Sequence, residues 1–292
     1  MADGVTVCVL CGTSFPPEEH RRFSKDGYAI VRCPACTLLF RRDLPAQAEL
    51  DEIYGLEYFQ GDATGYLDYV GDADLHRAAA RNRLELLEGL VARGALLDVG
   101  AAAGFFVDEA LARGWDARGI DVSQPMVEWG RRTLEVPLEQ ATLAEADVPD
   151  ESLGALTMWD YIEHSLDPAA DLRRARDLLR PGGVLALSTG DAATPVARLS
   201  GSRWHLLTPR HHNFFFTAAT LTELLVRSGF EVVSLDHRGG RYPLRYLVHK
   251  LGTLVRSRAL ESLTARLAAS RLGAVAVPVN LWDIATVAAR KK

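Results

Sequence analysis

From residue 95 onward, short apolar runs alternate with stretches of helical periodicity, and this alternation limits the fold more than any other feature of the sequence. Apolar runs separated by helix-length segments predict parallel strands joined by crossover helices, since parallel neighbours cannot be joined by tight turns. We therefore expect an α/β fold with an open sheet. The expected strands cover residues 95–99, 115–120, 136–140, 155–159, 184–188, 231–236 and 281–289.

The first of these strands runs into a loop of small residues, and residues 96–106 read Leu-Leu-Asp-Val-Gly-Ala-Ala-Ala-Gly-Phe-Phe. Small side chains let the backbone approach a ligand, and the helix that follows offers free N–H groups. Glycine spacing alone is a weak signal here because Ala102 takes the middle position, so a plain strand-to-helix turn stays open. Asp121, about 20 residues further on, is placed to accept hydrogen bonds from ribose hydroxyls. A dinucleotide or a nucleoside-type cofactor fits this pattern.

Four motifs in order resemble those of class I S-adenosylmethionine-dependent methyltransferases. Residues 97–104, with Asp98, Gly100 and Gly104, resemble the first motif, and Gly-Ile-Asp-Val-Ser at 119–123 resembles the second. Met-Trp-Asp-Tyr-Ile-Glu-His at 158–164 resembles the motif after the fourth strand, and Leu-Arg-Pro-Gly-Gly at 179–183 the turn before the fifth. The resemblance covers about residues 80–237. It implies a Rossmann-like, seven-stranded methyltransferase sheet and S-adenosylmethionine as the cofactor.

The resemblance also implies which residues contact this cofactor. Asp98 and the loop would hold the methionine and ribose part, Asp121 the ribose hydroxyls, and Val122 the adenine ring. Residues 141–143 fall at the adenine edge, and none of them is Asp. The implied cofactor-binding residues are Asp98, Gly100, Ala102, Gly104, Asp121, Val122, Thr142, Leu143, Trp159 and Asp160.

Histidines are the candidate general bases, because an alcohol acceptor needs a proton acceptor near neutral pH. His164 follows the fourth strand, at the carboxyl edge where open sheets bind ligands. In related methyltransferases with an N-terminal zinc ribbon, a Pro-x-His-x-x-x-Phe-like run lines the substrate pocket. By that resemblance His212 is a better match than His211. The alternative is that these histidines only cap helices and satisfy buried backbone groups.

All four cysteines lie in the first 36 positions as two Cys-x-x-Cys pairs, Cys8 with Cys11 and Cys33 with Cys36. Two such pairs are typical of a tetrahedral zinc site, and four thiolates leave no open position, so the site would be structural. The gap between the pairs is slightly longer than usual and would hold a hairpin. A redox or disulfide pair and a rubredoxin-type iron site are the alternatives.

These motifs divide the chain into a zinc ribbon at 1–40, a helical and aromatic segment at 41–94, and a cofactor-binding core at 95–237. A basic helical insertion, a candidate lid, is expected at 238–280, and 281–292 would form the last strand. The aromatic residues of the second segment are Tyr54, Tyr58, Phe59, Tyr66 and Tyr69, followed by an expected helix at 76–93. Residues 238–271 carry eight Lys and Arg against one Glu, a net charge of +7 in a chain of net charge -5. Three interpretations of the insertion stay open: a solvated cationic face, a lid for an anionic substrate, and a membrane-surface helix.

Together these features favour a methyltransferase that acts on a small molecule, a secondary metabolite or saccharide, most readily at oxygen. The acceptor is expected to be phosphorylated or carrier-bound if the insertion binds it. The alternative is a ribosomal-RNA base methyltransferase, but the acidic net charge argues against a nucleic-acid partner. Transfer to carbon or nitrogen and a non-catalytic relic also stay open. The N-terminus has no signal-peptide pattern and no stretch is long and apolar enough for a membrane helix, so a cytoplasmic location is expected.

Overall fold

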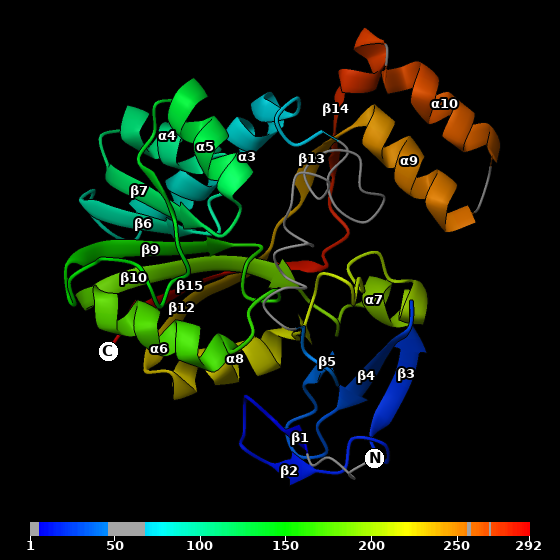
Figure 1. The fold of residues 1–292 in the computed structure, drawn as a ribbon, viewed down its shortest axis with the longest axis horizontal. Helices are drawn as coiled ribbons and strands as arrows, with labels where there is room; N and C mark the ends of the chain where they lie inside the picture. Colours follow the sequence, from blue (N-terminus) through cyan, green and yellow to red (C-terminus); the bar gives the residue numbers. More distant parts are fainter. Residues whose placement is uncertain (1–5, 46–67, 256–257, 269) are drawn as a thin grey trace.

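A computed structural model describes residues 6–45, 68–255, 258–268 and 270–292. Its centre is a seven-stranded sheet with the strand order β12-β15-β10-β9-β6-β7-β8 (Figure 1). All seven expected strands are present, with ends that differ by a few residues. They are β6 (Ala95–Val99), β7 (Asp116–Asp121), β8 (Leu138–Gln140), β9 (Leu153–Trp159), β10 (Leu179–Gly190), β12 (Phe230–His237) and β15 (Ile284–Lys291).

Helices cover both faces of this sheet, as expected for crossover connections (Figure 1). The first face carries α3 (Ala73–Glu88), α4 (Phe105–Ala112) and α5 (Gln124–Thr133), and the other carries α6 (Pro168–Leu178) and α8 (Ala218–Arg227). The start of α6 is set by Asp167, whose side chain accepts a hydrogen bond from the backbone of Ala170. Every residue of β9 is buried, because helices lie over both sides of the central strands.

The last strand departs from the parallel arrangement. β15 is antiparallel to both of its neighbours, β10 and β12. The chain leaves β12 at the carboxyl edge of the sheet, forms the insertion there, and returns through β15 from the same edge. This route places the insertion directly above the edge where open α/β sheets bind ligands.

The insertion, which we call the cap, contains an antiparallel ribbon of β13 (Gly240–Pro243) and β14 (Ala276–Val279). Between these strands lie the helices α9 (Leu244–Val255) and α10 (Arg258–Ala268) and the short η2 (Arg271–Ala274), so the expected helical cap is present. Arg245 of the cap forms an ion pair with Asp72, the residue before α3. Among the described residues, no helix has both the length and the apolar character needed to cross a membrane.

The N-terminal lobe is joined to the core by a shared sheet. The lobe contains β1 (Thr6–Val7), β2 (Ser14–Phe15), β3 (Arg21–Lys25), β4 (Tyr28–Arg32) and β5 (Leu39–Arg41). β5 also pairs with β11 (Phe214–Phe215), which lies after the short elements α7 (Pro195–Ser200) and η1 (Gly201–Arg203). The sheet of the lobe thus extends to Arg41, one residue past the expected boundary, and takes in a strand from the core.

The segment between the lobe and the core is described only in part. Tyr54, Tyr58, Phe59 and Tyr66 lie outside the described residues, whereas Tyr69 lies just before α3. The helix expected at 76–93 is α3, which begins at Ala73 and ends at Glu88.

Candidate active site

A cleft of about 1660 Å³ opens at the carboxyl edge of the sheet, beneath the cap. It is lined by the loop after β6, the ends of β7, β9 and β10, α3 from Leu75 to Leu86, and the cap ribbon. Pockets for one small molecule usually occupy 300–1,000 Å³. The cleft therefore has room for a nucleoside cofactor and an acceptor side by side.

The loop between β6 and α4 has the left-handed backbone that small residues favour. Gly100, Ala102 and Gly104 have φ values of 75°, 47° and 84°. Ala102 is strained in this conformation relative to glycine. Its N–H donates to Asp121 Oδ2 at 2.7 Å, and the N–H of Ser123 donates to Asp121 Oδ1 at 2.8 Å. Asp121 thus ties the loop to the end of β7, with its carboxylate at the cleft.

Asp98 is 3% exposed and is the last residue but one of β6, the strand that leads into this loop. Its Oδ1 accepts a hydrogen bond from the hydroxyl of Thr157 at 2.6 Å. Burial raises the pKa of Asp98 from 3.8 to about 7, although this hydrogen bond and the positive charge of Arg83 act in the opposite direction. A buried carboxyl with so high a pKa is suited to receive a cationic ligand group.

The three residues expected near adenine lie in different environments. Val122 is 42% exposed at the cleft, and Leu143 is buried at its wall. The N–H and hydroxyl of Thr142 both bond to Glu145 Oε2, at 3.0 and 2.7 Å. Thr142 therefore shapes a turn, and its polar atoms are already engaged within the chain.

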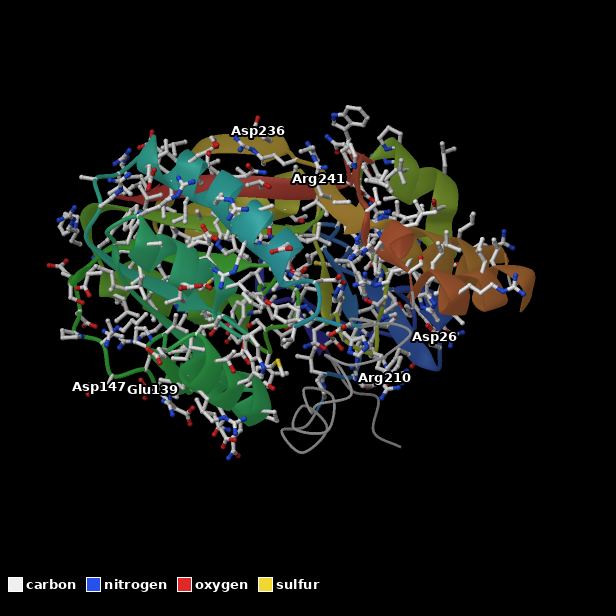
Figure 2. All side chains as sticks on the ribbon, turned by 90° about the horizontal axis from the view of Figure 1, so that it is seen from above. Asp26, Glu139, Asp147, Arg210, Asp236 and Arg241 are labelled. Carbon is white, nitrogen blue, oxygen red and sulfur yellow. The ribbon has the colours of Figure 1, made fainter. Side chains whose placement is uncertain are left out.

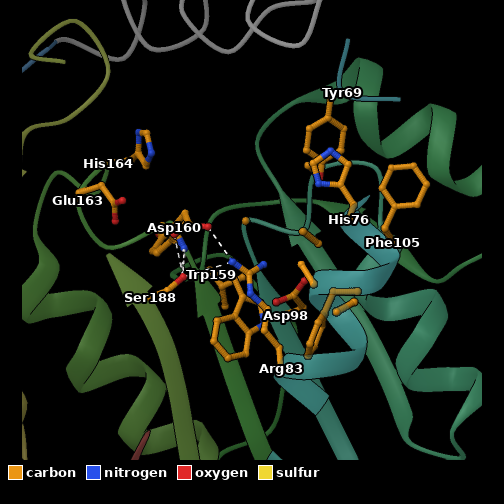
Figure 3. A pocket seen from close by; sticks show the side chains of 18 of the residues that line it. Tyr69, His76, Arg83, Asp98, Phe105, Trp159, Asp160, Glu163, His164 and Ser188 are labelled. Carbon is orange, nitrogen blue, oxygen red and sulfur yellow. Dashed lines mark hydrogen bonds and ion pairs between the residues drawn. The ribbon is translucent and has the colours of Figure 1, made fainter. Parts of the chain in front are cut away.

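Trp159 is the last residue of β9 and Asp160 follows it, at the mouth of the cofactor loop, where Arg83 of α3 contacts both (Figure 3). The guanidinium lies 4.7 Å from the centre of the Trp159 ring and 2.8 Å from Asp160 Oδ2. Ser188 of β10 donates to Asp160 Oδ1 at 2.8 Å. The sequence gives no sign that Arg83 is involved, because it lies on an ordinary amphipathic helix.

His164 and His212 both line the cleft, next to Glu163, and the centres of their rings lie 4.7 Å apart (Figure 3 shows Glu163 and His164). Burial lowers the pKa of His164 to about 4, so its ring is neutral at pH 7. Burial and the charge of Asp160 raise the pKa of Glu163 to about 8. His211 is buried, and its backbone carbonyl accepts a hydrogen bond from His164 Nδ1 at 2.9 Å. Of the three candidate bases, His164 and His212 thus come together and His211 lies behind them.

An aromatic wall that the sequence analysis left without a role faces the cofactor loop. Tyr69, His76 and Phe105 line the cleft in a stack, with ring centres 4.0 Å and 5.6 Å apart (Figure 3). Burial lowers the pKa of His76 to about 4, so this ring is also neutral. The spacing of Tyr69 and His76 across the start of a helix gives no local signal, because the stack forms only when α3 packs against α4.

The other wall of the cleft comes from the segment between η1 and β11, from β15 and from the cap. His205 lines the cleft, and its Nε2 lies 2.8 Å from Asp283 Oδ2, a carboxylate that also accepts from the indole of Trp204 at 2.8 Å. Tyr242 and Tyr246 stack with their ring centres 5.6 Å apart, and both line the cleft. These groups bring polar and aromatic surface to the acceptor side of the cleft.

The four cysteines lie together at the tip of the N-terminal lobe, away from the cleft. Cys8 Sγ lies 3.5 Å from Cys36 Sγ, and Cys11 Sγ lies 3.5 Å from Cys33 Sγ. All four sulfur atoms lie within 4.8 Å of one another. Zn–S bonds of about 2.3 Å place the sulfurs of a tetrahedral site about 3.8 Å apart. The donor set and its spacing therefore fit a zinc ion.

Comparison with known proteins identifies the family. A family profile described as a methyltransferase domain matches residues 72–235, more than half of the chain. The chain belongs to this family. Together with the seven-stranded sheet, the match confirms the expected class I S-adenosylmethionine-dependent methyltransferase.

Individual relatives are similar over parts of the chain. A probable S-adenosylmethionine-dependent methyltransferase of Mycolicibacterium smegmatis is 33% identical over 138 residues, which are 47% of this chain and 52% of that protein. A ubiquinone biosynthesis O-methyltransferase of Xanthomonas axonopodis pv. citri is 30% identical over 201 residues, 64% of this chain and 81% of that protein. A match to a ubiquinone biosynthesis O-methyltransferase of Psychrobacter arcticus covers 58% of that protein. In this match and in the Mycolicibacterium smegmatis match, the chain spans little more than half the length of the relative.

Solved structures share the fold at low sequence identity. The 1,6-didemethyltoxoflavin-N1-methyltransferase of Burkholderia thailandensis, solved with its substrate and S-adenosylhomocysteine, is 18% identical with a TM-score of 0.52. The match covers 94% of this chain and 99% of that one. A methyltransferase-like protein of Bacillus halodurans has a TM-score of 0.51 over 73% of this chain and 99% of its own.

Proposed function

We propose that this protein transfers a methyl group from S-adenosylmethionine to a hydroxyl group of a small molecule. The carboxylates of Asp98 and Asp121 at the ends of adjacent strands, with the loop between β6 and α4, support the cofactor assignment. The ubiquinone biosynthesis O-methyltransferase relatives support oxygen as the atom that is methylated.

S-adenosylmethionine supplies a methyl group on a positively charged sulfur, and the residues of the chain hold it in place. The Asp98 carboxylate would pair with the ammonium group, and Asp121 would accept hydrogen bonds from the ribose. Val122, Thr142 and Leu143 would border the adenine. Trp159 and Asp160, held by Arg83, would lie beside the sulfonium.

The observation that carries the proposal is the cluster formed by Glu163, His164 and His212, which lies in the same cleft as the cofactor loop. An acceptor hydroxyl placed against the cluster would lose its proton there as its oxygen forms the bond to the methyl carbon. The carbon–sulfur bond breaks and its electron pair stays on sulfur. The fold contributes chiefly by holding oxygen, carbon and sulfur in line. We assign His211 to the positioning of His164 through its backbone carbonyl.

The cap would select the acceptor. Arg241 lines the cleft, next to Tyr242 and Tyr246, and favours an acceptor that carries negative charge, such as a phosphorylated or carrier-bound compound. Figure 2 shows Arg241 where the cap joins the sheet domain, near Asp236 on β12. Arg238 and Arg245 attract an anionic acceptor less, because their charges are paired with Asp236 and Asp72.

We also propose that Cys8, Cys11, Cys33 and Cys36 bind a structural zinc ion. The lobe is too small to form a large core, so a zinc site would supply folding free energy, on the order of 10 kcal/mol. β5 of this lobe pairs with β11, and the backbone N–H of Arg41 donates to the carbonyl of Asn213, next to His212. The zinc lobe would thereby hold in place the segment that contains His212.

A double variant, His164→Gln with His212→Gln, tests the function. We expect turnover to fall by at least a hundredfold, whereas the dissociation constant for S-adenosylmethionine, measured by calorimetry, stays within about twofold. Turnover is followed by mass spectrometry with phenols and saccharides as acceptors, each with and without a phosphate group. Unchanged turnover in the double variant would remove the cluster from the mechanism.

Ribosomal RNA is included in the same assay as the alternative acceptor. A methylated base in RNA, together with no methylated small molecule, would replace the proposed function by the RNA methyltransferase.

A further inference from the structure

Glu163, His164 and His212 offer three ligand atoms that lie within 4.8 Å of one another in the cleft. Glu163 and His164 follow β9, and His212 comes from the segment before β11, 48 residues later in the chain. Two imidazoles and one carboxylate on one side of a cleft form a donor set that binds divalent transition metals and leaves the other positions open.

The two imidazole rings are oriented as metal ligands are. His164 Nδ1 lies 2.9 Å from the carbonyl oxygen of His211, and His212 Nδ1 lies 2.8 Å from that of Leu206. A carbonyl only accepts, so both Nδ1 atoms carry a proton, and the nitrogen of each ring that can offer a lone pair to a metal ion is Nε2. A backbone carbonyl behind each ring is the usual second contact of a metal-binding histidine.

Glu163 adds an independent sign of a ligand. Its side chain is 5% exposed, and its Oε2 atom is buried without a hydrogen-bond partner among the residues that the structure describes. Buried carboxylate oxygens in folded proteins normally have a partner, because leaving one unsatisfied is costly. A cation bound between Glu163 and the two imidazoles would provide it.

Backbone and side-chain hydrogen bonds hold the two segments of the cluster together. The N–H groups of Asn213 and Phe214 both donate to the carbonyl of Glu163, at 2.8 and 3.2 Å. The side-chain amide of Asn213 donates to the carbonyl of His164 at 2.9 Å and to that of Ser165 at 3.2 Å. The three ligand atoms are therefore brought together by the fold and do not depend on a chance approach of flexible side chains.

We propose that Glu163, His164 and His212 bind a second, catalytic metal ion of the zinc, manganese or iron(II) type. The proposal deepens the proposed function, on which it rests. The acceptor hydroxyl binds to an open position of this ion, which lowers the hydroxyl pKa, so the proton leaves to water. The oxygen then takes the methyl group, the carbon–sulfur bond breaks, and its electron pair stays on sulfur. In this mechanism the histidines hold the ion and do not themselves take the proton.

The metal content of the purified protein tests the site. Zinc per chain is counted by mass spectrometry, and Mn²⁺ is then added and its binding followed by electron paramagnetic resonance. Mn²⁺ is the probe because it prefers oxygen and nitrogen ligands to the cysteine thiolates. We expect two metal ions per chain in the wild type, as retained zinc or added Mn²⁺, and one in Glu163→Gln and in His212→Gln. His205→Gln is the matched control for metal binding, because His205 lines the same cleft outside the cluster, and it should keep two.

Equal metal counts in the wild type and Glu163→Gln would overturn the proposal. If His212→Gln misfolds, shown by loss of S-adenosylmethionine binding, the nearly isosteric Glu163→Gln decides alone. Methyl transfer is read separately: a second metal ion without O-methylation would sink the proposed function and keep the site. O-methylation by a protein that binds only the ribbon zinc would refute the second metal site and keep the proposed function.

Discussion

Asp98 is the residue whose protonation should control cofactor binding. It is buried beneath the cofactor loop, and its pKa is raised by burial from 3.8 to about 7. The α-amino group of S-adenosylmethionine, with an ordinary pKa of about 7.7–8.0, carries its charge below pH 7. The cofactor would therefore select the ionised form of Asp98, and this form becomes scarce as the pH falls below about 7.

The size of the effect follows from the pKa. Half of the Asp98 carboxyls are ionised at pH 7 and about 3% at pH 5.5, so the dissociation constant should rise about sixteenfold between these values. Isothermal titration calorimetry at constant ionic strength measures this change. 5′-Methylthioadenosine, which lacks the amino-acid end, is the ligand control and should bind with little dependence on pH.

Three variants separate Asp98 from other titrating groups. Asp98→Asn should bind the cofactor weakly at every pH, and its dissociation constant should no longer depend on pH. Thr157→Val removes the hydrogen bond at 2.6 Å that favours the carboxylate, so the midpoint should move to higher pH, and Thr157→Ser should restore it.

Stability provides the control for folding. A carboxyl whose pKa is raised in the folded state costs stability once it ionises, that is, as the pH rises from about 4 to above 7. Ligand-free Asp98→Asn should therefore be at least as stable as the wild type at pH 8. The same pH slope of cofactor binding in the wild type and Asp98→Asn would refute the reasoning.

Two further perturbations test the loop and the lobe. Gly104→Ala should destabilise the fold by about 2–3 kcal/mol in urea unfolding, because the added Cβ would lie 2.8 Å from Val136. Gly114→Ala is the control. Its φ is equally positive but nothing lies within 4 Å of the added Cβ, so it should destabilise the fold by only about 1 kcal/mol. Equal losses would show that close packing of the loop contributes nothing. Cys33→Ser, which removes one of the four proposed zinc ligands of the lobe, should lower turnover at least tenfold and leave cofactor affinity within twofold, because β5 pairs with β11 beside His212. Full turnover in a variant whose metal content shows that the zinc of the lobe is lost would contradict this.

The sequence alone determined the elements of this protein, because their signals are local. Parallel strands buried on both faces appear as apolar runs, and the turn at Gly100 and Gly104 needs small residues whatever surrounds it. The two Cys-x-x-Cys pairs likewise each place two sulfurs on one turn. Thus the seven strands, the cofactor loop and the cap helices were all expected before the structure.

Tertiary structure alone decided which of these elements meet. Glu163 and His212 lie far apart in the chain, and β5 and β11 still further, so no local pattern relates them. His211 and His212 are neighbours in sequence, yet the backbone turns only His212 to the cleft. Periodicity records which side chains of one element are buried, whereas contacts between distant elements depend on how the crossovers pack. The site where we expect the chemistry is for that reason a property of the fold, built from residues whose individual signals are weak.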